Sequence, residues 1–153
     1  AAARELDIPV LLDSWKEIIP VLEIGIDILK INREELSALT GQTDLRTAFD
    51  YCFARFAVNI IAITAGPDNA YLATDDKIWE YRLPPLDNVV NPIGAGDTAS
   101  AITFTEYLHG TDPVEAFAAG LAAASAGCLT EQAAVFDPEI AKKLQRMIKI
   151  KRI

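Results

Sequence analysis

Two short runs rich in isoleucine constrain the fold of this chain more than any other feature. They cover residues 26–31 and 59–64, and isoleucine dominates both of them. Runs of this length, separated by segments with helix-like patterns, are typical of strands that are buried on both faces of a parallel sheet. A third apolar run, at residues 8–13, ends in an acid and fits the same pattern. The sequence therefore predicts an α/β fold with a mainly parallel sheet.

Helix signals surround these strands. Ser14 is expected to cap a helix that reaches Leu22 and that Pro20 makes short or kinked. Later helices have clearer boundaries, such as Gly41 after one helix and Asp112 before another. Residues 77–82 alternate as in an antiparallel strand with one wet face. The predicted helices cover residues 33–39, 44–56, 98–109, 113–127 and 138–147.

The composition excludes several classes of protein. With 153 residues, of which 51% are apolar, the chain can bury a sizeable core and is too apolar to be disordered. No apolar run approaches the length of a membrane span, so we expect a cytoplasmic protein without a membrane partner. The net charge is −8, and six basic residues follow residue 140, so the rest is strongly acidic and ill-suited to nucleic acid. This basic end is predicted to be the solvated face of a last helix.

Cysteine and histidine chemistry finds little support. Cys52 and Cys128 are far apart in the sequence and are predicted to be buried free thiols, although two cysteines do not exclude a disulfide. The single histidine, His109, precedes a glycine at a predicted helix end, where a cation is ordinary. The spacing of these residues suits no Cys and His metal site.

The stretch with the most chemical information is 91–98, with the sequence N-P-I-G-A-G-D-T. Gly94 and Gly96 permit backbone conformations that a β-carbon would penalise, and Asp97 stands where a helix is expected to begin. The first amides of a helix have no internal partners, so residues 94–97 are predicted to form an anion site. A carboxylate at its edge suits phosphoryl transfer to a hydroxyl, which requires a proton acceptor. For this stretch alone, an Asp N-cap after turn glycines is the simpler interpretation.

Two further stretches have a structural and a functional interpretation. Asn32 precedes a predicted helix and Glu35 follows three residues later, which is the pattern of a capping box; alternatively, both lie near nucleotide phosphates, with Glu35 holding Mg²⁺ through water. Thr64 and Gly66 end a strand, either as a plain turn or as a hydroxyl and a bare backbone beside a base or ribose. The carboxyl ends of parallel strands share one edge, where Asp13 should join these residues.

Taken in order, three stretches resemble motifs of the ribokinase-like carbohydrate kinases, the phosphofructokinase-B type family. Residues 91–98 resemble its D-x-x-G-A-G-D-T signature, residues 30–41 its strand, N-x-x-E and helix, and residues 64–66 its T-x-G turn. The resemblance covers residues 8–138 and implies a ribokinase-like three-layer α/β fold. It also implies transfer of the γ-phosphate of ATP, with Mg²⁺, to a hydroxyl of a sugar, a nucleoside or a related small metabolite.

The resemblance assigns roles to named residues. Asp97 would act as the base, and amides of the preceding glycine loop, residues 91–96, would stabilise charge on the transferred phosphoryl group. Glu35 would act on the Mg²⁺ shell through water. The amides would be those of Gly94, Ala95 and Gly96. The nucleotide would be lined by Asn32, Thr64 and Gly66. The helix segment with Leu121 and Ser125 would cover the adenine.

The chain departs from the family pattern in two respects. Asn91 replaces the first acid of the signature and removes a charge near the phosphate loop, which puts in question the monovalent cation that some members bind close by. Members also run to about twice this length, and the half with the lid strands and most acceptor contacts is missing here. The 153 residues would then be the nucleotide-binding C-terminal portion of one ribokinase-like domain, inactive alone, with any homodimer formed through the missing lid.

A sugar is the expected acceptor, and three alternatives stay open on this evidence. A nucleoside kinase of the same family would differ only in its acceptor. A non-catalytic nucleotide-binding or regulatory module would suit the missing half and Asn91, whereas Asp97 and the complete Gly-Ala-Gly favour an enzyme. A purely structural fragment would bind no nucleotide.

Overall fold

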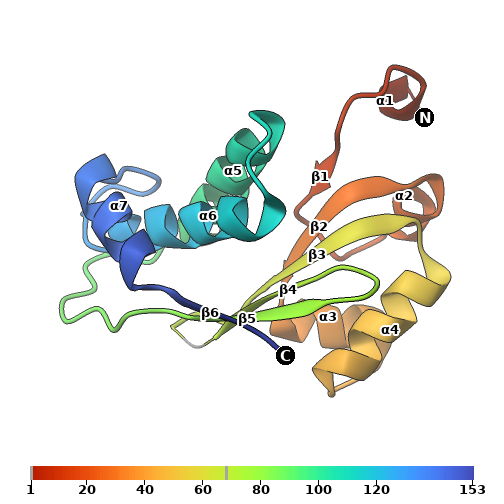
Figure 1. Ribbon diagram of the computed structural model, residues 1–153, viewed down its shortest axis with the longest axis horizontal. Helices are drawn as coiled ribbons and strands as arrows, with labels where there is room; N and C mark the ends of the chain where they lie inside the picture. The colour runs from red at the N-terminus through yellow and green to blue at the C-terminus, as the bar shows by residue number, and fades with distance from the viewer. Residues whose placement is uncertain (1, 68) are drawn as a thin grey trace. The chain divides into compact units, whose positions relative to one another are not determined.

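The computed structural model describes residues 2–67 and 69–153, which form helices and strands (Figure 1). The predicted order of strands and helices is confirmed as far as α7 (Pro138–Met147), with changes at some boundaries, and the last strand, β6 (Lys149–Arg152), was not predicted. In chain order the elements are α1 (Ala2–Glu5), β1 (Leu11–Leu12), α2 (Ile19–Ile24), β2 (Ile26–Asn32), α3 (Arg33–Thr40), α4 (Leu45–Arg55), β3 (Val58–Thr64), β4 (Ala70–Ala73), β5 (Ile78–Arg82), α5 (Ala95–Leu108), α6 (Pro113–Gly127), α7 (Pro138–Met147) and β6 (Lys149–Arg152).

The strands form one mixed sheet in the order β1-β2-β3-β4-β5-β6. Strand β2 is parallel to both β1 and β3, and β3 is antiparallel to β4. Figure 1 shows β2 and β3 side by side, and their residues are mostly buried, as expected for parallel strands that are covered on both faces. The predicted α/β class with parallel strands is therefore confirmed.

The chain divides into two compact units. The first contains strands β1 to β4, helices α1 to α4 and the beginning of β5, and the second contains helices α5 to α7. The first unit comprises Ala1–Gly66, Ala70–Trp79 and Arg152–Ile153, and the second comprises Pro67–Asn69 and Glu80–Lys151.

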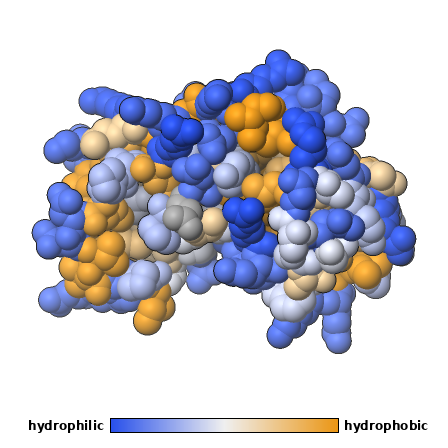
Figure 2. Space-filling view, turned by 90° about the horizontal axis from the view of Figure 1, so that it is seen from below, coloured by the Kyte–Doolittle hydropathy of each residue, from blue (hydrophilic) through white to orange (hydrophobic). Residues whose placement is uncertain are grey.

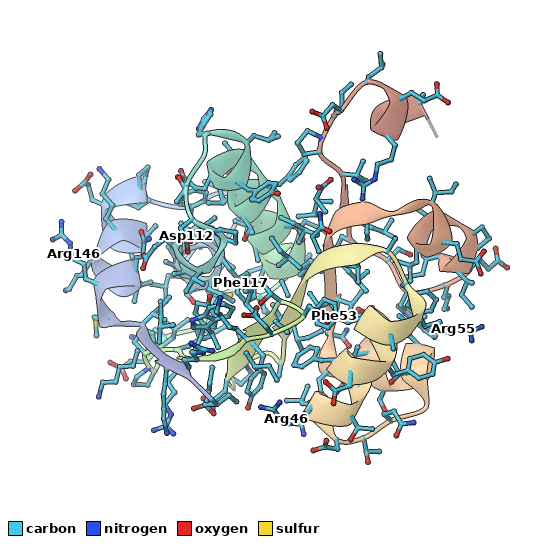
Figure 3. All side chains as sticks on the ribbon, turned by 45° about the vertical axis from the view of Figure 1, so that its right-hand side comes forward. Arg46, Phe53, Arg55, Asp112, Phe117 and Arg146 are labelled. Atoms are coloured by element: carbon cyan, nitrogen blue, oxygen red, sulfur yellow. The ribbon has the colours of Figure 1, made fainter. Side chains whose placement is uncertain are left out.

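The first unit has a core of strand and helix side chains. Leu29 and Ile61, from β2 and β3, are fully buried in one cluster with Phe49 and Cys52 from α4. Phe53, which projects from the same helix in Figure 3, packs against this cluster. Burial raises the pKa of the Cys52 thiol to about 11, so Cys52 is a protonated core residue at neutral pH.

The second unit depends on the close packing of α5 and α6. A Cβ at Gly120 would collide with the Thr103 hydroxyl and come within 2.6 Å of the Ala99 carbonyl oxygen, so only glycine allows these helix backbones to approach so closely. Phe117, which is labelled on α6 in Figure 3, packs edge-to-face against Tyr81 with ring centroids 5.1 Å apart. The Tyr81 hydroxyl donates to a backbone carbonyl of α6 at 3.0 Å, which satisfies its polar end.

Two predicted features near the ends of the chain are wrong. The short helix does not begin after Ser14, because α2 starts at Ile19. Pro20 lies in the first turn of α2, where a backbone N–H would have no acceptor within the helix, so its missing N–H costs nothing there. The basic end is not one helix face, because Lys149–Arg152 forms strand β6 after α7 has ended.

Two predicted burial patterns also need correction. Strand β5 does not alternate, since Trp79 and Glu80 are both half-buried between the buried residues Ile78 and Tyr81. Both cysteines are free thiols, as predicted, but Cys128 is only half-buried. The prediction of buried free thiols therefore holds in full for Cys52 alone.

Large apolar side chains are exposed at several places on the surface. One of them is Ile93, in the glycine loop, which is 72% exposed. On the face shown in Figure 2, hydrophilic residues separate the apolar areas, so that face is not one continuous apolar surface. Across residues 2–67 and 69–153, no helix combines the length and the apolar character that crossing a membrane requires.

Candidate functional site

Strands β2 and β3 end in polar residues at the same level of the sheet. Asn32 is the last residue of β2, Thr64 is the last residue of β3, and the two are register partners. Both side chains are half-buried. The first unit thus brings two predicted nucleotide-binding residues together at the carboxyl end of parallel strands, where α/β folds bind ligands.

The Asn32 side chain also caps helix α3. Its Oδ1 accepts a hydrogen bond from the Glu35 amide at 2.8 Å, and Oε2 of Glu35 accepts one from the Asn32 amide at 2.8 Å. The predicted capping box is therefore confirmed. The box uses neither Asn32 Nδ2 nor the second Glu35 oxygen, Oε1, so a structural role does not preclude a contact with a ligand.

The chemistry of Glu35 suits Mg²⁺ through water. Mg²⁺ keeps several waters and is usually held by one or two carboxylates together with phosphate oxygens, not by a cage of protein ligands. Within the described ranges, no group of three or more His, Cys, Asp or Glu side chains is placed to hold a metal ion. A single half-buried carboxylate with one oxygen outside the capping box fits the outer-shell contact that the resemblance implies.

Gly66 follows Thr64 closely and has a φ of +60°. Apart from its two chain neighbours, no described residue has an atom within 4 Å of the position that a Cβ would occupy there. The positive φ therefore favours glycine at this position, whereas the space around it would admit a side chain. The open space beside it is compatible with a ligand that approaches the main chain.

A partly buried ion pair lies near these strand ends, and the predicted site residues do not include it. Lys30 Nζ in β2 lies 3.1 Å from Oδ2 of Asp13, and the side chains are 6% and 31% exposed. The sequence does contain a signal for it, namely a lysine within the apolar run 26–31, because a lysine is rarely buried without a partner. Asp13 was expected at this strand edge, and its pairing with Lys30 is the new observation.

In the second unit, helix α5 begins three residues earlier than predicted. Gly94 is its N-cap with a φ of +81°, a conformation that glycine adopts readily. The Thr98 amide donates to the Gly94 carbonyl oxygen at 2.9 Å, and the Thr98 hydroxyl donates to the same oxygen at 2.9 Å. Asp97 is therefore the third residue of the helix, and the interpretation of Asp97 as the N-cap is wrong.

The first turn of α5 has no side-chain cap. The Ala95 amide donates to the Pro92 carbonyl oxygen at 3.2 Å, whereas the Gly96 and Asp97 amides lie where a helix has no internal acceptor. Asp97 is exposed, and in the part of the chain that the structure describes its carboxylate accepts no hydrogen bond. One helical turn therefore presents open amides and an unpaired carboxylate.

Backbone contacts tie the glycine loop to residues 128–135. The Val90 and Asn91 amides both donate to the Cys128 carbonyl oxygen, at 2.8 and 3.1 Å. A Cβ at Gly94 would come within 3.3 Å of the Ala134 nitrogen, so the two segments are in close contact at the helix start. The position of the first turn of α5 thus depends on the segment 128–135.

The Asn91 side chain adds a second connection between the same segments. Its Oδ1 accepts a hydrogen bond from the Ile93 amide at 3.0 Å, and its Nδ2 donates to the Glu131 carbonyl oxygen at 3.0 Å. Asn91 therefore has a specific partner on each side of its amide.

Leu121 and Ser125 lie one turn apart on α6. Their exposed fractions are only 4% and 7%, so little of either side chain is available to a base. Their role beside the adenine stays a prediction from the resemblance.

The predicted site residues fall into two groups. The first unit holds Asn32, Glu35, Thr64 and Gly66, and the second holds the glycine loop, Asp97 and the two residues on α6. In the first unit, the structure places the ends of β2 and β3 next to each other. In the second unit, it places the predicted phosphate-binding amides and Asp97 in the first turn of α5.

Comparison with known proteins agrees with this architecture. The family model described as pfkB family carbohydrate kinase matches residues 1–140. A 1-phosphofructokinase from Haloferax volcanii is 33% identical over 129 residues, which are 80% of this chain and 41% of that protein. The chain therefore spans less than half the length of this curated relative.

Two solved structures share the fold. Phosphofructokinase-2 from Escherichia coli in complex with potassium has a TM-score of 0.86 at 24% identity, and the match covers 95% of this chain and 49% of that one. Ribokinase from Arabidopsis thaliana complexed with ribose and ATP has a TM-score of 0.82 at 27% identity, covering 95% and 50%. Because the family model matches most of its length, this chain belongs to the pfkB family of carbohydrate kinases.

Proposed function

We propose that the protein carrying this chain is an ATP-dependent phosphotransferase that moves the γ-phosphate of ATP to a hydroxyl of a sugar or a related small metabolite. The chain supplies the nucleotide-binding C-terminal portion of one ribokinase-like domain. Family membership supports the carbohydrate acceptor. The observation that carries the proposal is the exposed Asp97 carboxylate, which has no partner among the described residues and lies in the same helical turn as open backbone amides.

The N-terminus of α5 binds the phosphoryl group that is transferred. Backbone amides and the helix dipole together favour an anion at this position. The Gly94 and Gly96 amides keep the role that the resemblance implies. The Asp97 amide joins them, and the Ala95 amide contributes less because it already donates to Pro92.

Asp97 orients the acceptor hydroxyl and takes its proton. The hydroxyl oxygen forms a bond to the γ-phosphorus while the bond from that phosphorus to the leaving oxygen of ADP breaks, and the hydroxyl proton passes to the carboxylate. The charge that develops on the phosphoryl oxygens is stabilised by donors that are already in place on the helix. On one helical turn, the carboxylate accepts the proton and the amides stabilise the charge on the phosphoryl oxygens.

The first unit binds the nucleotide. Asn32 and Thr64 offer an amide and a hydroxyl at adjacent strand ends, and Gly66 leaves its main chain accessible. Glu35 would hold Mg²⁺ through water, and the bound ion would neutralise charge on the phosphates. The homodimer expected through the lid stays a prediction.

The test is the variant Asp97→Asn in the intact protein, assayed with ATP, Mg²⁺ and a panel of sugars, sugar phosphates and nucleosides. We expect the turnover number to fall by about 10² to 10⁴, as for loss of a general base, while ATP binding persists. Asp87→Asn is the matched control, since Asp87 is an exposed acid ten residues upstream, and it should leave turnover unchanged.

The outcomes separate the alternatives. Normal turnover by Asp97→Asn would contradict the role of Asp97. Phosphorylation of nucleosides in preference to sugars would make the protein a nucleoside kinase. Nucleotide binding without any phosphoryl transfer by the unchanged protein would indicate a regulatory module, and no nucleotide binding would indicate a structural role.

A further inference from the structure

Asn91 connects two segments through the two ends of one side chain. Its Oδ1 accepts from the Ile93 amide, inside the turn that leads to Gly94, and its Nδ2 donates to the Glu131 carbonyl oxygen. The orientation of the carboxamide follows from its partners, because a backbone N–H can only donate and a carbonyl can only accept. The half-buried side chain therefore uses an acceptor on one side and a donor on the other.

A carboxylate at residue 91 could make only one of these two contacts. One oxygen could still accept from the Ile93 amide, but the other would face the Glu131 carbonyl oxygen, which lies 3.0 Å from Asn91 Nδ2. Two acceptors at that separation repel each other unless a proton or a cation lies between them. The signature that this loop resembles has an aspartate at this position. The asparagine therefore differs from that aspartate in the one atom that faces Glu131, which is a nitrogen and not an oxygen.

The donor set at this point does not fit a monovalent cation. Such an ion needs oxygen ligands, and here an N–H points at the carbonyl oxygen that would otherwise be a ligand. We infer that Asn91 is a positioning residue whose carboxamide holds the glycine loop against residues 128–135 and makes this loop independent of a monovalent cation. The inference rests on the proposed function of the loop in binding the transferred phosphoryl group.

The contact is relevant to catalysis because the two segments meet at the start of α5. The Cys128 carbonyl oxygen accepts from the Val90 and Asn91 amides, and Ala134 lies against Gly94. A shift of Glu131 away from residue 91 would therefore displace the N-cap of the helix that carries Asp97. Because phosphoryl transfer depends on position, a small displacement lowers the turnover number more than the affinity for ATP.

The test compares initial rates of the intact protein in potassium chloride and in choline chloride at equal ionic strength. The unchanged protein should have the same turnover number in both salts. Asn91→Asp should be about tenfold slower in choline chloride, the effect expected when one hydrogen bond is lost and its partner is left unpaired, and potassium should restore its rate. Asn91→Ala should be slowed similarly and should not respond to potassium.

Asn88→Asp is the control variant, because it adds the same charge at an exposed asparagine three residues upstream. It should match the unchanged protein in both salts. Activation of the unchanged protein by potassium would overturn the inference, and so would an Asn91→Asp variant that potassium does not rescue.

Thermal unfolding of the same intact proteins in the two salts provides a readout that needs no activity. Potassium should raise the unfolding temperature of Asn91→Asp and leave that of the unchanged protein the same. If no acceptor is phosphorylated, the proposed function fails while these unfolding temperatures still decide the role of Asn91. A potassium-dependent rise for the unchanged protein would overturn the inference.

Discussion

The N-termini of α3 and α5 share an acid at the third helical position and use it in opposite ways. Each helix has a carboxylate as its third residue, Glu35 in α3 and Asp97 in α5. In α3 the N-cap is Asn32, and the two side chains satisfy each other's backbone amides. In α5 the N-cap is Gly94, which has no side chain, and the acid extends into solvent. One helix start is closed by its own side chains, and the other is left open.

The other long helices follow the pattern of α3. Asp44, Asp112 and Asp137 cap α4, α6 and α7, and each accepts a hydrogen bond from a first-turn amide. Among helices of eight or more residues in the described ranges, α5 alone lacks a side-chain cap. A side-chain cap satisfies donors that would otherwise be open, so its absence at α5 leaves those donors for a ligand.

The largest effect on this comparison is expected from Gly94→Ala. The φ of +81° costs an alanine about 1–2 kcal/mol, and its Cβ would press on the Ala134 nitrogen at 3.3 Å. Because the first turn of α5 would move, we expect the turnover number of the intact protein to fall by about 10- to 100-fold, measured as initial rates at saturating ATP.

Gly110→Ala is the matched control at the other end of α5. Gly110 has a φ of +84°, and among the residues that the structure describes, its chain neighbours apart, none has an atom within 4 Å of its Cβ position, so this variant carries the same backbone cost without the crowding. It should lose about 1–2 kcal/mol of unfolding free energy and keep its turnover number. Equal losses of turnover in the two variants would show that general destabilisation, and not the position of the first turn, lowers the rate.

A smaller effect is expected at the closed helix start. Glutamine can replace glutamate in a capping box, so Glu35→Gln should keep the unfolding free energy within about 0.5 kcal/mol. Its loss of charge should raise the Mg²⁺ concentration that half-saturates the rate. Glu35→Ala breaks the box and should also lose about 1 kcal/mol, measured by denaturant unfolding. A Glu35→Gln variant with unchanged Mg²⁺ dependence would limit Glu35 to its structural role.

Local signals explain why the first unit could be predicted well. The strand at 26–31, the cap at Asn32 and the stop at Gly41 depend on residues that are close in sequence, and the structure confirms all three. The register that places Asn32 beside Thr64 also follows from the parallel arrangement, since both residues end their strands. The cap and the stop need no knowledge of distant segments, whereas the pairing of Asn32 with Thr64 depends on β2 and β3 being neighbours in the sheet.

The rest depended on conformations and contacts that the sequence does not reveal. The start of α5 was missed because paired glycines are typical of turns, and only the φ of Gly94 shows that the helix begins directly after it. The role of Asn91 depends on Glu131, forty residues later in the chain. The pairing of Lys30 with Asp13 likewise joins a residue of β2 to the residue that follows β1, although the buried lysine itself could have been noticed.

The most direct test of the open helix start is a nuclear magnetic resonance titration of the ¹⁵N-labelled intact protein with Mg²⁺ and a non-hydrolysable ATP analogue. The Gly96 and Asp97 amide resonances should shift as the analogue saturates the protein. The Val114 amide, which donates to its own cap Asp112 at 2.9 Å, should stay in place as an internal control. If the analogue binds while the Gly96 and Asp97 resonances do not move, the N-terminus of α5 is not the phosphate site.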